Sequence, residues 1–226
     1  MNTDISPVVA FDLDGTLAET APDLIHVLNL TLADEHLPDT RVEEARQLVG
    51  NGVKILVQRA LAKYGKSVSE ERLEELFQRF LGLYEQNICI YSRLYPGVEA
   101  ALQELLARGY RLAVCTNKPD RHSHLLLEAL GIAGCFAAIC GRDALPWAKP
   151  DARALWGAIE KAGGVRERAV MVGDSKTDFE TAHNAGVPSI AFPFGYATEP
   201  VENYAPTLVV ASWAELVPAV ERLLGP

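Results

Sequence analysis

The chain has 226 residues, of which 49% are hydrophobic, and 21 basic against 30 acidic side chains give it a formal net charge of −9. This length and composition predict a globular protein with one large domain, or one domain with an insertion. The acidic balance argues against nucleic acid as a partner, and no apolar run approaches the roughly 18 residues of a membrane helix.

The first predicted element is a buried strand at residues 8–11, where the four residues VVAF are apolar and rich in β-branched and aromatic types. It ends at Asp12, and Asp14-Gly15 then indicates a tight turn. Ligands of open α/β sheets bind outside the carboxyl ends of the strands. Two carboxylates at such an end favour a cation site and a nucleophile.

Residues 20–90 predict helices and no convincing strand. Thr20 and Asp23 have the spacing of a capping box for a helix through residue 32, and Ser69 is expected to cap a long amphipathic helix through Tyr84. Two further helices are expected between them, at residues 41–48 and 53–63. This block is therefore predicted to be all-α.

From residue 95 onward, predicted strands and helices alternate. Strands are expected at 111–115, 136–140, 169–172, 189–192 and 208–210. Helices are expected at 98–107, 119–130, 151–162 and 177–185, and a last helix through 224 is expected to begin with a capping box of Ser212 and Glu215. Such alternation predicts βαβ units in a parallel sheet, and the first strand must join that sheet because a lone strand is unstable.

The predicted fold class is therefore α/β, with a doubly wound parallel-sheet core and an inserted all-α helical cap. We expect the core to comprise residues 1–18 and 92–226 and the cap to comprise residues 19–91.

Polar side chains follow four of the predicted strands, and in a parallel sheet all four sets emerge at one edge. They are Asp12 and Asp14; Thr116, Asn117 and Lys118; Lys149; and Gly173, Asp174, Ser175 and Asp178. Burying several carboxylates together is costly unless a metal or a cationic partner offsets them. A divalent cation together with Lys149 would do so, and oxygen ligands suit Mg²⁺.

Other metal sites and disulfides are not expected. The five histidines lack zinc-ligand spacing, and His122 and His124 do not share a helix face, so we expect both at the surface. The D-x-D start of an EF-hand is not followed by its further ligands. No close CxxC spacing is present, so the cysteines are expected to be buried, reduced thiols of a cytoplasmic protein; they are Cys89, Cys115, Cys135 and Cys140. Residues 1–4 carry no basic patch, and we expect no signal peptide.

These motifs, in this order, resemble those of the phosphatase branch of the haloacid dehalogenase superfamily. The matching segments are D-x-D-G-T at 12–16, Thr116-Asn117, Lys149-Pro150 and G-D-S-x-x-D at 173–178. Further stretches at 11–17, 49–52, 114–119 and 194–196 are similar to the phosphoglycolate phosphatase group within it.

The resemblance implies a role for each site residue. Asp12 would accept the phosphoryl group, and Asp14 would protonate the leaving oxygen and then activate water. Lys149 would neutralise phosphate charge. Thr116 and the backbone amides of Leu13 and Asn117 would hold the phosphoryl oxygens. Mg²⁺ would be bound by Asp12, the backbone carbonyl of Asp14, and Asp174, with Gly173, Ser175 and Asp178 in support.

The predicted cap contains a second group of candidates. Gly50, Asn51 and Gly52 either stop a helix or form a loop over the nucleophile that contacts the rest of the substrate, and the resemblance favours the loop. Phosphonatase-like members place a cap lysine in the site, for which Lys54 and Lys63 are candidates, although a solvated helix face suits both. Gly15 and the residues after Thr16 are expected to act as a hinge. Three departures from the family pattern bear on the substrate: Arg142, Trp147-Ala148 and Asp151-Ala152-Arg153.

The leading hypothesis is a Mg²⁺-dependent phosphatase for a small phosphorylated acid, 2-phosphoglycolate first. The alternatives of the same fold are a phosphosugar mutase, which would keep Asp12 and Asp14, and a phosphatase for another small metabolite. A non-catalytic phosphate-binding or partner-binding module is the alternative of another class. We expect a monomer or a homodimer.

Overall fold

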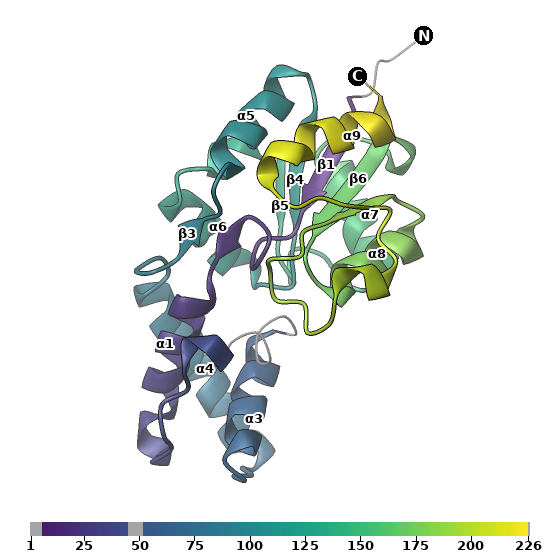
Figure 1. The fold of residues 1–226 in the computed structure, drawn as a ribbon. Helices are drawn as coiled ribbons and strands as arrows, with labels where there is room; N and C mark the ends of the chain where they lie inside the picture. Colours follow the sequence, from purple (N-terminus) through teal and green to yellow (C-terminus); the bar gives the residue numbers. More distant parts are fainter. Residues whose placement is uncertain (1–5, 45–51, 226) are drawn as a thin grey trace.

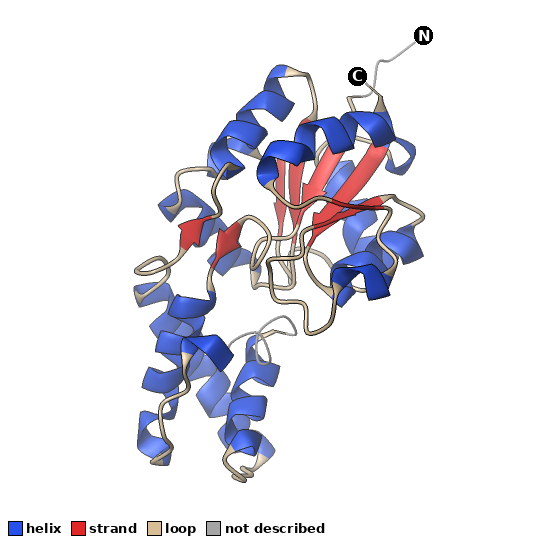
Figure 2. Ribbon diagram, in the orientation of Figure 1, coloured by secondary structure: helices blue, strands red, loops and turns tan. Residues whose placement is uncertain are grey.

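The computed structural model describes residues 6–44 and 52–225. Its core is a parallel sheet of six strands in the order β5-β4-β1-β6-β7-β8 (Figures 1 and 2). The strands are β1 (Val8–Phe11), β4 (Arg111–Cys115), β5 (Ala138–Cys140), β6 (Ala169–Gly173), β7 (Ser189–Ala191) and β8 (Leu208–Val209). Strands alternate with helices as expected, and the doubly wound core is confirmed.

The direction of winding reverses at β1, which lies in the middle of the sheet. β1 pairs in parallel with β4 on one side and β6 on the other, so that Phe11 lies level with both Val114 and Val172. The chain runs outward from β4 to β5, and later outward in the opposite direction from β6 through β7 to β8. Ligand sites in such sheets lie at this switch point, which here places Asp12 in the centre.

Side-chain alternation along the strands separates two apolar layers. Val9 and Phe11 face one layer together with α5 (Val98–Ala107), α6 (Asp120–Ala129) and α9 (Leu216–Leu224). Val8 and Ala10 face the other, with α7 (Ala152–Lys161) and α8 (Lys176–Ala185). Because both faces are covered, the central strands β1 and β6 read as continuous apolar runs.

A separate helical unit, called the cap below, projects beyond the carboxyl edge of the sheet (Figure 1). It contains α1 (Ala21–Leu32), α3 (Val53–Lys63) and α4 (Glu70–Gln86). Both α1 and α3 pack against α4, and the three helices share an apolar core of their own. Ser69 caps α4 as expected, because its hydroxyl accepts a hydrogen bond from the amide of Arg72.

Sequence reasoning missed a two-stranded antiparallel ribbon where this unit joins the core. It pairs β2 (Ala18–Glu19) with β3 (Arg93–Leu94), and both strands are visible in Figure 2. The expected boundaries at 18/19 and 91/92 fall within or beside this ribbon. Strands of two residues carry no readable periodicity, so only the approach of the two connections reveals them.

The expected capping box at the start of α1 is wrong. Thr20 makes no side-chain capping bond. The Asp23 carboxylate instead accepts hydrogen bonds from the amides of Tyr91 and Ser92 and from the Ser92 hydroxyl. It thereby joins α1 to the returning connection.

Three smaller expectations also change. The last helix is preceded by a 3₁₀ turn at Trp213–Glu215 rather than capped by the Ser212 side chain. Of the helix expected at 41–48, the structure describes a 3₁₀ turn at Val42–Glu44, and the remainder lies outside the described residues. All four cysteines are free thiols; two are buried and two are partly exposed, namely Cys89 and Cys135.

Among the residues with described positions, no helix is both long enough and apolar enough to cross a bilayer.

Candidate active site

The polar residues that follow β1, β4 and β6 meet in one cavity at the carboxyl edge of the sheet. Core residues line one side of this cavity, among them Asp12, Thr116 and Lys149, while the cap lines the other side with apolar side chains such as Leu24 and Leu56. The cavity volume of about 60 Å³ is room for a few water molecules. A small, polar ligand fits such a space.

Asp12 and Lys149 form the centre of the site. The Lys149 ammonium lies 2.9 Å from Asp12 Oδ1 and 2.5 Å from Asp178 Oδ1. All three residues are buried. Burial, together with the Asp178 charge, raises the pKa of Asp12 to about 6 even though Lys149 lowers it. For Lys149, burial opposes the charged form, but the two carboxylates raise its pKa above the usual value. Lys149 therefore stays a cation.

Asp178 positions Lys149 and the start of α8. Its second oxygen, Oδ2, accepts hydrogen bonds from the amide and hydroxyl of Ser175, which completes a capping box at the helix N-terminus. Gly173 leaves the space for this arrangement, because a Cβ there would lie 2.4 Å from Asp178 Cβ. The supporting role that the resemblance implies for these three residues stays a prediction.

Asp174 is held by groups from two distant segments. The Thr16 hydroxyl donates to its Oδ1 at 2.6 Å, and the amide of Tyr196 donates to its Oδ2 at 2.6 Å. Gly15, at φ +89°, and Gly195 both approach it so closely that a Cβ at either position would collide with the carboxylate. Burial and the charges of Asp178 and Asp12 raise the pKa of Asp174 well above its ordinary value.

The donors at this centre fit a hard divalent cation. One carboxylate oxygen from each of Asp12, Asp174 and Asp178 lies within 4.8 Å of the others, a separation comparable to twice the ~2.1 Å of a Mg–oxygen bond. The buried Oδ1 of Asp12 accepts no hydrogen bond of normal geometry within the described part of the chain. The Asp14 side chain is not in this group, so any contribution from it would come through its backbone carbonyl, as the resemblance implies.

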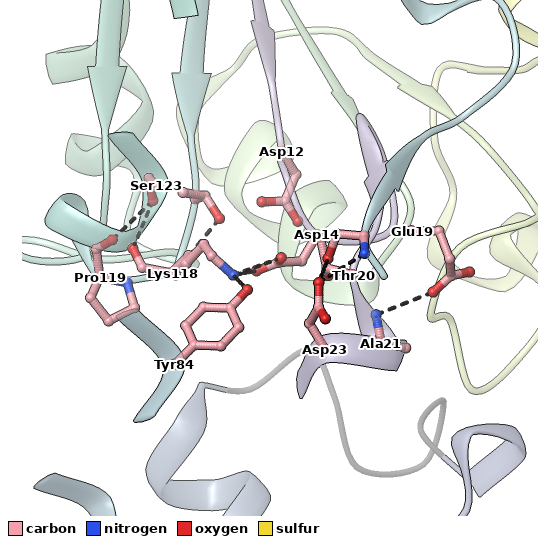
Figure 3. Close-up of polar contacts among 12 residues, drawn as sticks. Asp12, Asp14, Glu19, Thr20, Ala21, Asp23, Tyr84, Lys118, Pro119 and Ser123 are labelled. Atoms are coloured by element: carbon pink, nitrogen blue, oxygen red, sulfur yellow. Dashed lines mark hydrogen bonds and ion pairs between the residues drawn. The ribbon is translucent and has the colours of Figure 1, made fainter. Parts of the chain in front are cut away.

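The Asp14 carboxylate faces a lysine to which sequence reasoning assigned no role. Lys118 Nζ lies 2.9 Å from Asp14 Oδ1, and it also donates to the Tyr84 hydroxyl at 2.8 Å (Figure 3). Lys118 was among the polar residues after the second predicted strand, and Tyr84 was in the apolar stripe of α4. Their meeting is a contact between core and cap, which no local pattern shows.

Leu13 follows β1, and Thr116 and Asn117 follow the neighbouring strand β4. The amide of Thr116 donates to the carbonyl of Cys140, and its hydroxyl faces the amide of Lys118. Asn117 Nδ2 donates to the Lys149 carbonyl at 3.0 Å, which ties together the loops that carry the two cavity residues. Leu13 is fully buried directly after Asp12.

The cap candidates divide into three groups. Gly52 lines the cavity at the start of α3, whereas Gly50 and Asn51 lie outside the described residues. Lys54 binds Glu70 and Glu74, and Lys63 binds Glu44, so both are on ion-paired helix faces. Neither lysine lines the cavity.

His122 is not at the surface as expected. It is 4% exposed, and its Nε2 faces the Leu81 carbonyl at 3.2 Å. Burial lowers its pKa, and the ring lies beside that of Tyr84 in the cavity wall. Its position on the inner face of α6 becomes apparent only once the cap covers that helix.

The departures from the family pattern lie away from the cavity lining. Asp151 caps α7 and pairs with Arg153, whose guanidinium lies 4.8 Å from the centre of the Trp147 ring. Arg142 is exposed, and its amide donates to the Lys118 carbonyl. None of these residues lines the cavity that contains Asp12.

Comparison with known proteins agrees with this geometry. Residues 9–192 match the family model described as haloacid dehalogenase-like hydrolase. A phosphoglycolate phosphatase of Mesorhizobium japonicum is 44% identical over 221 residues, with 96% of each chain covered, and one of Caulobacter vibrioides is 43% identical, with 96% of this chain and 91% of that protein covered.

Solved structures show the same arrangement. A crystal structure of a predicted phosphoglycolate phosphatase from Haemophilus somnus superposes with a TM-score of 0.88 at 33% identity, covering 95% of this chain and 97% of that one. CbbY from Rhodobacter sphaeroides, solved in complex with phosphate, superposes with a TM-score of 0.75 at 27% identity, covering 94% and 96%. The chain belongs to the haloacid dehalogenase-like hydrolase family.

Proposed function

We propose that this chain, a phosphatase, hydrolyses 2-phosphoglycolate with Mg²⁺ through an aspartyl-phosphate on Asp12. The observation that carries the proposal is the convergence of Asp12, Asp14, Lys149 and Asp174, which follow three different strands, on a single small cavity. The names of the relatives support the choice of substrate, and the size of the cavity is consistent with it.

The first half-reaction follows from the placement of the two aspartates after β1. An Asp12 oxygen attacks phosphorus, and the bond to the ester oxygen breaks as Asp14 gives that oxygen a proton. Lys149 offsets charge on the transferring group. Bound Mg²⁺, held by Asp12, Asp174 and the Asp14 carbonyl, would neutralise the charge that phosphoryl transfer spreads over the oxygens.

The second half-reaction returns the enzyme to its starting state. Asp14, now ionised, takes a proton from water, whose oxygen attacks the phosphorus of the acyl phosphate. The bond between phosphorus and the Asp12 oxygen breaks, and inorganic phosphate leaves. A phosphosugar mutase would instead return the phosphoryl group to a second hydroxyl of the sugar.

Measurement of phosphate release tests this proposal directly. Wild-type protein with Mg²⁺ is expected to release phosphate from 2-phosphoglycolate, and Asp12→Asn is expected to lower kcat by at least about 10⁴-fold, because the amide is not a nucleophile. EDTA should abolish the wild-type rate and Mg²⁺ should restore it. Asp34→Asn, at an exposed cap position paired with Arg79, is the matched control and should keep full activity. Turnover by Asp12→Asn, or sugar-phosphate isomers in place of phosphate, would refute the assignment.

A further inference from the structure

Lys118 is a buried cation that the proposed chemistry does not use. It follows β4 in the core, its side chain is 3% exposed, and it forms an ion pair with Asp14. Burial alone would oppose its charge, but Asp14 and Tyr84 raise its pKa above the usual value. A charged lysine at this depth needs partners on all sides, and Figure 3 shows only two of them.

Within the described residues, the partners of the Lys118 ammonium group leave one direction for a ligand. Of its three protons, one is directed at the Asp14 carboxylate, whose oxygens lie 2.9 and 3.3 Å away, and one at the Tyr84 hydroxyl at 2.8 Å. Both Lys118 and Tyr84 line the cavity that contains Asp12. The Tyr84 oxygen accepts a hydrogen bond from Lys118. Its own proton donates to no other group among the described residues.

Covalent geometry connects this pair to one class of substrate. Asp14 must contact the ester oxygen to protonate it. In 2-phosphoglycolate the carboxylate carbon is two bonds from that oxygen, so the carboxylate comes within contact distance of a group adjacent to Asp14. Lys118 Nζ is that group, and a second anion several carbons further along a sugar chain would extend past it.

We propose that Lys118 and Tyr84 form a carboxylate subsite that selects short phosphorylated 2-hydroxy acids over neutral phosphate esters. The inference rests on the proposed phosphatase activity. Lys118 contributes an ammonium donor from the core, and Tyr84 contributes a hydroxyl donor from α4 of the cap. Because the two donors come from opposite sides of the cavity, a bound carboxylate also joins cap to core.

The test compares two substrates that differ in the carboxylate. These are 2-phosphoglycolate and 2-hydroxyethyl phosphate, in which a hydroxymethyl group replaces it. For wild type we expect kcat/KM to favour 2-phosphoglycolate by about 10- to 100-fold, the effect of one charge-assisted hydrogen bond. Lys118→Met should reduce this preference to about threefold or less. Any effect of Lys118→Met on Asp14 changes kcat/KM for both substrates alike and therefore cancels in the ratio of the two values.

Two variants accompany Lys118→Met. Tyr84→Phe keeps the ring and Lys118 but removes one donor, and should lower the preference by about 3- to 10-fold; it decides the question if Lys118→Met does not fold in a thermal melt. Lys54→Met removes a cap lysine that is paired with Glu70 and Glu74, and should leave the preference unchanged.

The outcomes separate the two proposals. No phosphate release by wild type from 2-phosphoglycolate would defeat the proposed function itself. Two results would overturn the subsite and leave the phosphatase assignment standing. One is hydrolysis by wild type with similar kcat/KM values for the two substrates. The other is an equal loss of kcat/KM on both substrates in Lys118→Met and Tyr84→Phe.

Discussion

Asp12 illustrates how the requirements of the site act against stability. It lies with Asp14, Asp174 and Asp178 around two buried lysines, so carboxylates outnumber the cations that face them. Burial raises its pKa from 3.8 to about 6. The unfolded chain therefore loses this proton at lower pH than the folded chain, and the free energy of unfolding falls as pH rises between these two values.

A stability measurement on Asp12→Asn follows from this charge imbalance. In EDTA, we expect Asp12→Asn to match wild type near pH 4 and to exceed it at pH 8 by up to about 3 kcal/mol, since a shift of two units corresponds to that energy. Urea unfolding at the two pH values measures the difference. Mg²⁺ should stabilise wild type more than the variant, because it binds the folded state through Asp12. Equal unfolding free energies at pH 8 without metal would contradict the argument.

The pH dependence of activity is expected to run opposite to that of stability. In the proposed mechanism Asp12 is ionised when it attacks, and its pKa of about 6 in the metal-free site predicts that kcat/KM falls as pH decreases through the region near 6. Bound Mg²⁺ favours the ionised carboxylate and should move this acid-side fall of the pH–rate profile to lower pH. Rate profiles at low and saturating Mg²⁺ measure the displacement. If Mg²⁺ instead moved the fall in kcat/KM to higher pH, a group other than Asp12 would control it.

At the scale of elements, the loop between β7 and β8 has a structural role that its sequence does not indicate. Its Phe194-Gly195-Tyr196 segment brings backbone against Asp174. A Cβ on Gly195 would lie 2.2 Å from Asp174 Oδ2, whereas one on Gly82, within α4, meets nothing within 4 Å. The same substitution should therefore act oppositely at the two positions.

Gly195→Ala should displace Asp174 and lower kcat by at least about tenfold, with a weaker apparent affinity for Mg²⁺. Gly82→Ala should leave activity unchanged and raise the free energy of unfolding by about 0.5–1 kcal/mol, because alanine is the better helix former. Phosphate-release kinetics across Mg²⁺ concentrations and urea unfolding measure both effects. A Gly195→Ala variant with wild-type Mg²⁺ dependence would count against the role assigned to this loop.

At the scale of the whole molecule, Tyr196 connects the carboxylate cluster at the sheet edge to the cap. Its amide holds Asp174, while its hydroxyl donates to Glu19 and accepts hydrogen bonds from the amides of Thr20 and Ala21 at the start of α1. The ring also belongs to the apolar core of the cap. One side chain from the core loop therefore orients the first turn of the cap.

Tyr196→Phe should weaken this connection without removing the ring. Loss of the hydroxyl leaves the Thr20 amide without its partner and removes one bond each from Ala21 and Glu19, which keep their bond to each other, so we expect a destabilisation of about 1–3 kcal/mol. Amide hydrogen exchange at Thr20 and Ala21 should accelerate, while the amides of β1 keep their protection. Unchanged exchange at the start of α1 would show that the ribbon and Asp23 alone hold the cap.

The sequence by itself determined the elements and most of the chemistry of the core edge. Apolar periodicity and turn residues are properties of near neighbours, so β4, α5 and the strand-end residues Asp12 and Asp174 could be predicted without coordinates. The tertiary structure decided which side chains meet across the boundary between cap and core. Lys118 with Tyr84, Asp23 with Ser92, and the β2–β3 ribbon join segments far apart in the chain, and their contacts depend on how the cap sits over the sheet. No local pattern encodes that approach, because each partner taken alone has the surroundings of an ordinary helix or turn residue.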